Sequence, residues 1–204
     1  MHEGTKERIV ATAAAIMHRK GFLGTGLKEI LDGAGVPKGS FYHHFKSKED
    51  LGLAVVEFQA ARLRVRMEAC LGDAGLSPLV RLRTLFETLR EDFVGAGFRL
   101  GCPIGNLAQE MGDLSEPFRL RLGASLDRLS GWLAGHLEAG QRAGEIDPDL
   151  DSDEAARFLL ASWQGALTCM KASGDARPLD TFLHFTFALL TRHTTARAEG
   201  ARRG

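Results

Sequence analysis

Two short helical segments separated by a glycine corner place the strongest constraint on the fold of this chain. Ile30 and Ala34 give residues 27–34 an apolar face, and Gly35 follows as the residue best suited to a left-handed corner. A second helix is expected to open at Pro37 and to end near His44. A short helix, a tight turn and another short helix are typical of a helix-turn-helix, whose second helix lies in the major groove of DNA.

Charge is distributed unevenly along the sequence. Its 204 residues carry 26 basic and 26 acidic side chains, so the formal net charge is zero. Residues 1–48, however, contain eight lysines and arginines but only four aspartates and glutamates, which gives this segment a net charge of +4. A basic segment within a neutral chain is typical of a region that binds a polyanion, and the helix-turn-helix pattern makes double-stranded DNA the expected partner.

Composition argues against several other classes of protein. The three cysteines are odd in number and widely spaced, which favours neither a disulfide framework nor a zinc site. No apolar run approaches the roughly 20 residues that a membrane span needs, and the apolar residues 9–17 are too short and too closely flanked by charge for a signal peptide. We therefore expect a soluble cytoplasmic protein with reduced thiols and with no membrane partner, metal or cofactor.

An enzyme is not expected either. The glycines of residues 95–105 neither follow a strand nor fit the spacing of a phosphate-binding loop. Glu110 and Asp113 have no evident catalytic partner in the sequence. His43 and His44 are adjacent, so on a helix they point about 100° apart and make a poor metal site.

Helical periodicity runs through the rest of the chain. The spacing of apolar residues, with capping residues and glycine or proline stops, predicts helices at residues 6–20, 27–34, 37–44, 48–71, 104–111, 151–170 and 179–192, with two more starting at residues 77 and 115. We find no strand pattern and no internal repeat. The predicted fold class is all-α.

The segment from Gly21 to Leu51 resembles the DNA-binding domain of TetR/AcrR-type transcriptional regulators. The matching features are Gly21-Phe22, Thr25, Ala34-Gly35-Val36, Lys38-Gly39, Tyr42-His43-His44-Phe45 and Ser47-Lys48-Glu49-Asp50-Leu51. The resemblance implies about nine helices, with an N-terminal three-helix domain and a larger C-terminal helical domain for effector binding and dimerisation. We accordingly expect a DNA-binding domain at residues 1–47, an effector-binding and dimerisation domain at 48–194, and a disordered tail at 195–204.

The same resemblance assigns DNA contacts. It implies phosphate contacts for Thr25, Tyr42 and Lys48, although Tyr42 could instead be a core aromatic. The whole predicted set is Thr25, Lys28, Lys38, Gly39, Ser40, Tyr42, His43, His44, Lys46 and Lys48. Pro37 stands where a serine commonly caps the recognition helix, so that cap is expected to be lost or replaced.

Dimerisation is expected to involve the last two predicted helices. Their small residues would let a partner helix approach, and their large apolar residues would supply buried area. The predicted interface comprises Ala155, Leu159, Trp163, Ala166, Phe182, Phe185 and Leu189. These helices could alternatively complete the core of one protomer.

An effector is expected to act on the middle of the chain. The segment from Gly97 to Arg119 resembles a subgroup of NemR- and AcuR-type repressors. Cys102 precedes a short helix whose dipole favours a thiolate, which suits a sensor of electrophiles or oxidants, although a buried packing role is the alternative. For a non-covalent effector the predicted pocket comprises Phe86, Phe93, Phe98, Asn106, Trp132, His136 and Trp163.

Taken together, these features predict a homodimeric repressor that a small-molecule or electrophilic effector releases from a palindromic operator. An activator of the same family, or a DNA-binding protein without an effector, is the alternative.

Overall fold

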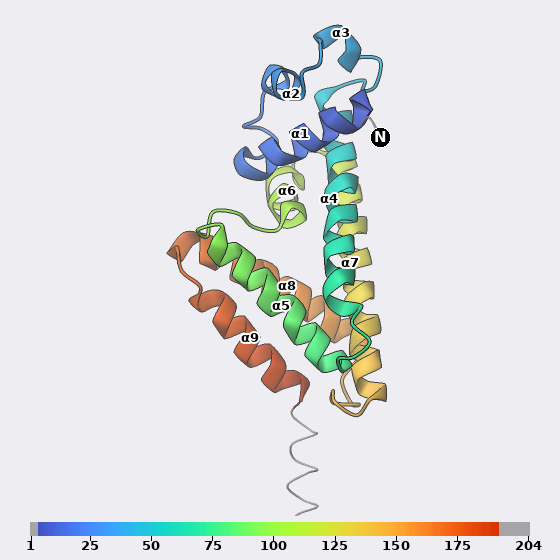
Figure 1. The fold of residues 1–204 in the computed structure, drawn as a ribbon, viewed down its shortest axis with the longest axis vertical. Coiled ribbons are helices and arrows are strands. Elements are labelled where there is room, and N and C mark those ends of the chain that lie inside the picture. Colours follow the sequence, from blue (N-terminus) through green and yellow to red (C-terminus); the bar gives the residue numbers. More distant parts are fainter. Residues whose placement is uncertain (1–3, 192–204) are drawn as a thin grey trace, which may run out of the picture. The chain divides into compact units, whose positions relative to one another are not determined.

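Nine helices make up the regular secondary structure of residues 4–191, which is the part of the chain that this computed structural model describes. They are α1 (Thr5–Lys20), α2 (Leu27–Ala34), α3 (Lys38–Phe41), α4 (Lys48–Leu71), α5 (Pro78–Gly95), α6 (Pro103–Met111), α7 (Glu116–Arg142), α8 (Ser152–Ser173) and α9 (Arg177–Leu190) (Figure 1). The all-α prediction is confirmed. The tail predicted at residues 195–204 lies outside the described residues, among which no helix is long and apolar enough to cross a membrane.

Local capping signals set several helix boundaries where they were predicted. α2 ends at Gly35, whose φ of 63° and ψ of 40° lie in the left-handed region. α5 begins after Ser77, which accepts a backbone N–H of the first turn, and Pro78 takes the first helical position. The Asp151 side chain caps α8 in the same way.

The helix predicted to read DNA is shorter than expected. α3 comprises Lys38–Phe41 only, and residues 42–44 continue as a turn rather than as helix. Pro37 precedes the helix without any side-chain cap, as expected from the missing serine. Gly39 also has low helix propensity. The expected helix through residue 44 is therefore corrected to one turn of helix followed by a non-helical turn.

The chain divides into two compact units, and the division falls within α4 and α7. The first unit comprises the residues up to Arg64 together with Gly101–Leu126, so it holds α1–α3 and α6 with parts of α4 and α7. The second comprises Val65–Leu100 and the residues from Asp127 onward, with α5, α8 and α9. The helices of the predicted DNA-binding domain thus share a unit with α6.

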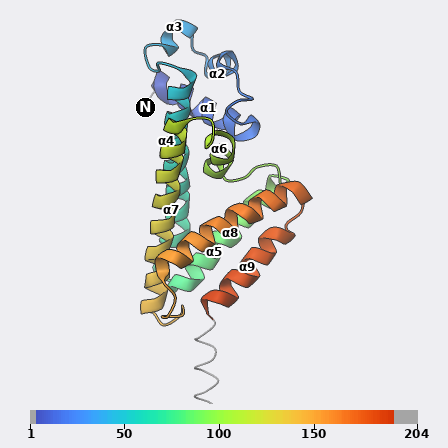
Figure 2. The ribbon, with the colours of Figure 1, turned by 180° about the vertical axis from the view of Figure 1, so that it is seen from behind.

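The first unit is built on the apolar face of α1. Ile9 and Ala13 are fully buried on that face, and α1 packs directly against α2, where Ile30 is also fully buried. Phe41 anchors α3 in the same core. α6 lies beside α1 in both ribbon views (Figure 1; Figure 2).

The second unit has an aromatic core. α9 packs directly against α5 and α8, and the three helices lie side by side (Figure 2). Phe86 of α5, Trp163 of α8 and Phe182 of α9 are all buried, and each pair of their ring centroids is 5.0 or 5.1 Å apart. The Phe86–Trp163 pair is edge-on and the other two pairs are tilted, and ring contacts of this kind favour a specific packing of the three helices.

Candidate nucleic-acid interface

α3 and the turn after it present most of the predicted DNA-reading residues to solvent. Lys38, Gly39, Tyr42, His43 and His44 are exposed, and Ser40 is half-buried. Phe41, between them, points inward and lies 5.6 Å from the Phe45 ring, centroid to centroid. The exposed lysine, hydroxyl and imidazole groups are suited to phosphate oxygens and to base edges in a groove.

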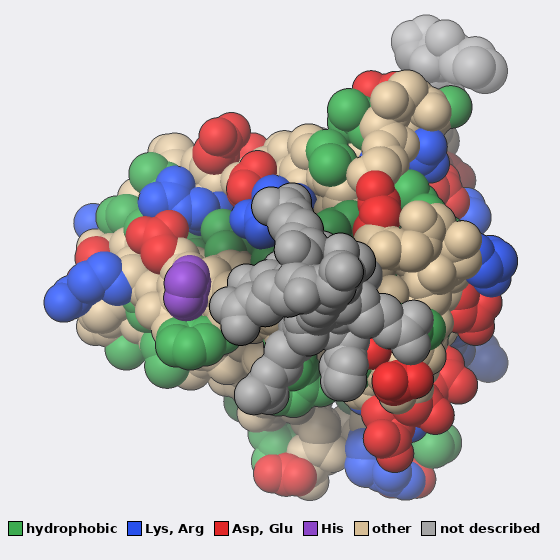
Figure 3. Space-filling model, turned by 90° about the horizontal axis from the view of Figure 1, so that it is seen from below, with side chains coloured by type: hydrophobic (Ala, Val, Ile, Leu, Met, Phe, Trp, Pro, Cys, Tyr) green, Lys and Arg blue, Asp and Glu red, His purple; other side chains and the backbone are tan. Residues whose placement is uncertain are grey.

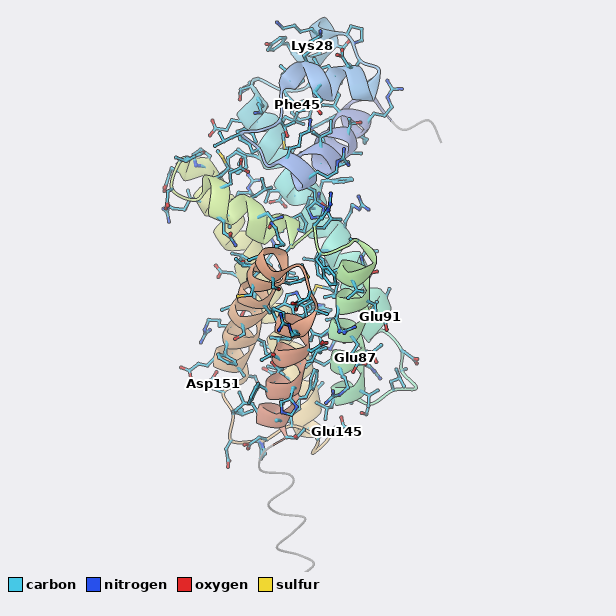
Figure 4. The ribbon with its side chains drawn as sticks, turned by 90° about the vertical axis from the view of Figure 1, so that its left-hand side faces the viewer. Lys28, Phe45, Glu87, Glu91, Glu145 and Asp151 are labelled. Atoms are coloured by element: carbon cyan, nitrogen blue, oxygen red, sulfur yellow. The ribbon has the colours of Figure 1, made fainter. Side chains whose placement is uncertain are left out.

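Two more lysines add positive charge near α3. Lys28 and Lys46 are both exposed, and Lys28 lies at the surface whereas Phe45 lies among the helices (Figure 4). The Asp50 carboxylate accepts the backbone N–H of Lys46 at 2.9 Å, which holds the start of α4. Exposed lysines of this kind supply the sequence-independent attraction to DNA phosphates.

Thr25 and Lys48, for which phosphate contacts were predicted, are engaged with the protein itself. Thr25 is 1% exposed, and its hydroxyl donates to the Gly21 carbonyl at 2.6 Å. The Lys48 ammonium donates to the Phe22 carbonyl at 2.6 Å. Burial lowers the pKa of Lys48, and the nearby Glu110 carboxylate opposes that shift. In this structure both side chains stabilise the loop between α1 and α2.

Glu110 of α6 is a residue whose role sequence reasoning missed. Its Oε2 accepts the Phe22 N–H at 2.7 Å, and its Oε1 accepts the Leu23 N–H at 2.8 Å. Gly21 has a φ of 78°, and a Cβ there would lie 2.6 Å from both carboxylate oxygens. The glycine–aromatic pair at positions 21 and 22 belongs to the family resemblance, but it does not point to Glu110.

The other end of α6 is tied to α1. Nε2 of His18 lies 2.7 Å from the Gly101 carbonyl oxygen, so this nitrogen carries the proton and donates. Cys102 follows as the N-cap of α6, and its Sγ accepts the Gly105 N–H at 3.5 Å. The thiol is at the helix N-terminus, as predicted, but it is only 7% exposed.

The residues predicted to bind a non-covalent effector are divided between the units. Asn106 belongs to the first, as does the predicted covalent sensor Cys102, and Phe86, Phe93, Phe98, Trp132, His136 and Trp163 belong to the second. Phe93 extends the aromatic core, with its ring centroid 6.3 Å from that of Trp163. Phe98 has a φ of 63°, which makes it the one non-glycine residue with a positive φ in the described part of the chain. Such strain is uncommon for a bulky residue.

Trp132 and His136 form a separate pair on α7. Their rings are 4.5 Å apart in an edge-on arrangement, and both side chains are half-buried. Burial lowers the pKa of His136, and the positive charge of Arg81 lowers it further. The imidazole therefore favours its neutral form, which can both donate and accept a hydrogen bond.

The predicted dimer interface is partly buried inside the protomer. Leu159 and Trp163 are buried within the second unit, and Phe182 is buried there as well but also lines a groove between α8 and α9. Phe185 and Leu189 are exposed, and Ala155 and Ala166 are half-buried. The prediction missed Phe158, because α8 carries apolar residues on two faces and periodicity alone does not say which face is covered.

An apolar groove of about 650 Å³ follows this surface. Residues of α8 and α9 line it, among them Phe158, Ala166, Phe185 and Leu189. Phe158 is 54% exposed and Phe185 is 66% exposed. In the view from below, hydrophobic side chains lie at the surface between the charged ones (Figure 3).

An N-terminal stretch and a longer C-terminal stretch of the chain each match a known protein family. The family described as "Bacterial regulatory proteins, tetR family" matches residues 9–55, which span nearly all of α1 to the first turns of α4. The family described as "Tetracyclin repressor-like, C-terminal domain" matches residues 78–186, from α5 into α9.

Individual relatives align along most of the chain. The transcriptional regulator AcuR of Cereibacter sphaeroides is 37% identical over 180 residues, covering 88% of this chain and 80% of that protein. The repressor DhaR of Mycobacterium sp. strain GP1 is 34% identical over 189 residues, covering 93% of each. The crystal structure of reduced NemR from E. coli has a TM-score of 0.83 and 31% identity, covering 89% of this chain and 94% of that one. This chain therefore belongs to the TetR family and is a DNA-binding transcriptional regulator, not an enzyme.

Proposed function

We propose that this protein is a homodimeric repressor that binds a palindromic operator in the cytoplasm and leaves it when an effector acts. The observation that carries the proposal is the presence, in one chain, of an exposed DNA-reading segment after Pro37 and an unpaired apolar surface on α8 and α9. Two of the relatives, DhaR and NemR, are named as repressors, which supports the direction of regulation.

The DNA contacts are assigned to the exposed residues around α3. Lys38, Gly39, Ser40 and His43 approach base edges, and Tyr42, His44, Lys28 and Lys46 approach phosphates. Thr25 and Lys48 support DNA binding indirectly, because their hydrogen bonds hold the loop that leads into α2. The short α3 places its N-terminal end in the groove, which is where recognition helices make their base contacts.

The dimer forms when a second copy covers the α8–α9 groove. Phe158 and Phe185 supply large apolar area, while the smaller Ala155 and Ala166 let a partner helix approach. A two-fold arrangement sets two recognition helices about one turn of DNA, roughly 34 Å, or a little more apart. A palindromic operator follows from that symmetry.

The effector acts either on Cys102 or on the aromatic residues of the second unit. Cys102 caps α6, so alkylation or oxidation of its Sγ would remove the Gly105 hydrogen bond and disturb the first turn of the helix. A non-covalent effector would instead use Phe93, Trp132 or His136, which are half-buried and therefore partly accessible.

Selection of duplexes from a random library with the purified protein tests the proposal. We expect an enriched inverted repeat that the wild-type protein binds at physiological salt at least about a thousandfold more tightly than a scrambled duplex. Binding should weaken steeply as salt rises. Enrichment of no sequence, or of a single half-site bound by one protomer, would contradict the proposal.

A further inference from the structure

The backbone of Phe22 is held on both sides by opposite charges from distant helices. Its N–H donates to Glu110 of α6, at 2.7 Å, and its carbonyl accepts from Lys48 of α4, at 2.6 Å. The ring lies 5.0 Å from Phe118 of α7, centroid to centroid, and a Cβ at Gly52 of α4 would lie 2.7 Å from it. Three helices that lie outside the DNA-reading segment therefore converge on one loop residue.

α6 is attached to the DNA-binding helices at both of its ends. His18 contacts the Gly101 carbonyl just before the helix, and Glu110 contacts the loop near its last turn. A helix of nine residues is about 13 Å long, so the two contacts fix its direction as well as its position. Cys102 lies at the first of these contacts, one residue after Gly101.

We propose that Glu110 is a positioning residue for operator binding. By accepting the N–H groups of Phe22 and Leu23, it fixes the position of the start of α2 and, through α2, the position of α3. The proposal rests on the operator binding proposed above. Only residues 24–26 separate this contact from α2, so a displaced loop moves the recognition segment directly. The same contact carries a change at the Cys102 end of α6 to the DNA-binding helices.

A carboxylate is required because two N–H donors converge on one side chain. Glutamine has the same shape but a single acceptor oxygen, so it would present its own NH₂ group to one of the two donors. Removal of the negative charge makes the DNA-binding unit more positive, which by electrostatics alone would strengthen binding to DNA. Positioning predicts weaker operator binding in Glu110→Gln, so the two effects have opposite signs.

The test compares wild-type protein, Glu110→Gln and Asp113→Asn on the selected inverted repeat and on a scrambled duplex. Asp113 is exposed in the turn after α6, so Asp113→Asn makes the same charge change nearby. We expect Glu110→Gln to bind the inverted repeat fivefold or more weakly, on the order of a typical coupling between sites. Glu110→Gln should bind the scrambled duplex as tightly as the wild-type protein or slightly more tightly. Asp113→Asn should bind both duplexes as tightly as the wild-type protein or slightly more tightly.

Amide hydrogen exchange supplies a reading that a general loss of stability does not reproduce. In the wild-type protein the amides of Phe22 and Leu23 should be protected from exchange. In Glu110→Gln at least one of these two amides should exchange faster. The amides in the middle of α1 should keep their protection in the variant. Rapid exchange of both amides in the wild-type protein would overturn the proposal even if the variant did not fold. Equal affinity of Glu110→Gln and wild type for the inverted repeat would also overturn it. Failure of the wild-type protein to select any duplex would instead refute the proposed function.

Discussion

The ammonium of Lys48 lies 4.3 Å from the centre of the Phe22 ring while it donates a hydrogen bond to the carbonyl of the same residue. This pairing occupies a lysine that family resemblance assigned to a DNA phosphate. Whether a lysine neutralises a phosphate or holds a loop can be measured, because only the first role appears in the salt dependence of DNA binding.

Lys48→Met should lower the free energy of unfolding by about 1–2 kcal/mol, because the Phe22 carbonyl loses a charged donor. It should leave the slope of log affinity against log salt unchanged, since no phosphate contact is removed. Lys38→Met, the matched control at an exposed position of α3, should reduce the slope by about one unit with little effect on unfolding. Denaturant titration and binding isotherms at several salt concentrations check both variants. If Lys48→Met instead reduced the slope by about one unit, Lys48 would have to contact a DNA phosphate, as the family resemblance predicted.

Phe185→Glu should convert the dimer into a monomer. A charge at this exposed position of α9 would be buried without a partner when a second copy covers the groove. Sedimentation velocity measures the change, and affinity for the inverted repeat should fall with it. Leu120→Glu, at an exposed position on α7 in the other unit, should remain dimeric. A dimeric Phe185→Glu protein would place the interface elsewhere.

Cys169 gives a second measurement of the same interface. It follows Phe158 by eleven residues, close to three helical turns, so both lie on one exposed face of α8. Maleimide labelling of Cys169, read by peptide mass spectrometry, should be slow in the wild-type dimer and fast in Phe185→Glu. Equal labelling rates would show that this face of α8 stays open in the dimer.

The contrast between α8 and the loop at Phe22 shows what can be predicted from sequence. Helix ends at Gly35 and Ser77-Pro78 depend on a few consecutive residues, so their signals are local and were predicted. The buried Leu159 and the exposed Phe158 are neighbours of similar hydropathy. Which of them faces the core depends on where α5 and α9 pack, and helical periodicity does not contain that information.

The role of Glu110 was unpredictable for another reason. Its partners are backbone N–H groups 87 and 88 positions away, and a backbone donor leaves no mark on residue identity. The same holds for His18 and the Gly101 carbonyl. Thr25 and Lys48 were found by resemblance, but their hydrogen bonds to backbone carbonyls depend on the folded loop. The exposure of the side chains proposed to read DNA was easier to predict, because it follows from the pattern of basic and aromatic residues around α3.

His136 should make the protein less stable at acid pH. Its pKa in the folded state is lowered, mainly by burial, below the ordinary value of about 6.5 that it takes in the unfolded chain. As pH falls through that ordinary value, the unfolded chain gains a proton that the folded chain resists, so the free energy of unfolding decreases. The decrease is complete below the lowered pKa and is absent at pH 8.

Denaturant titrations of His136→Gln at pH 8, 6.5 and 5 check this expectation. The variant should lose less stability between pH 8 and pH 5 than the wild-type protein. His43→Gln, at an exposed position, serves as the control and should follow the wild-type profile. Identical pH profiles for His136→Gln and wild type would exclude the imidazole as a source of acid sensitivity.

Cys102→Ser should separate sensing from packing. A serine hydroxyl can cap α6 by accepting the Gly105 N–H, so we expect the variant to fold and to bind the inverted repeat with an affinity within about threefold of wild type. Addition of N-ethylmaleimide should release the wild-type protein from this duplex, because the maleimide adduct on Sγ does not fit the nearly enclosed site. The variant should stay bound.

Cys169→Ser provides the matched control, because it removes a thiol of α8 and leaves Cys102 and the start of α6 unchanged. This variant should be released as readily as the wild-type protein. Release is also expected to be slow, since reaction at the buried Sγ requires the first turn of α6 to open. Release of Cys102→Ser by the same reagent at the same rate would assign Cys102 to packing and leave the aromatic residues of the second unit as the effector site.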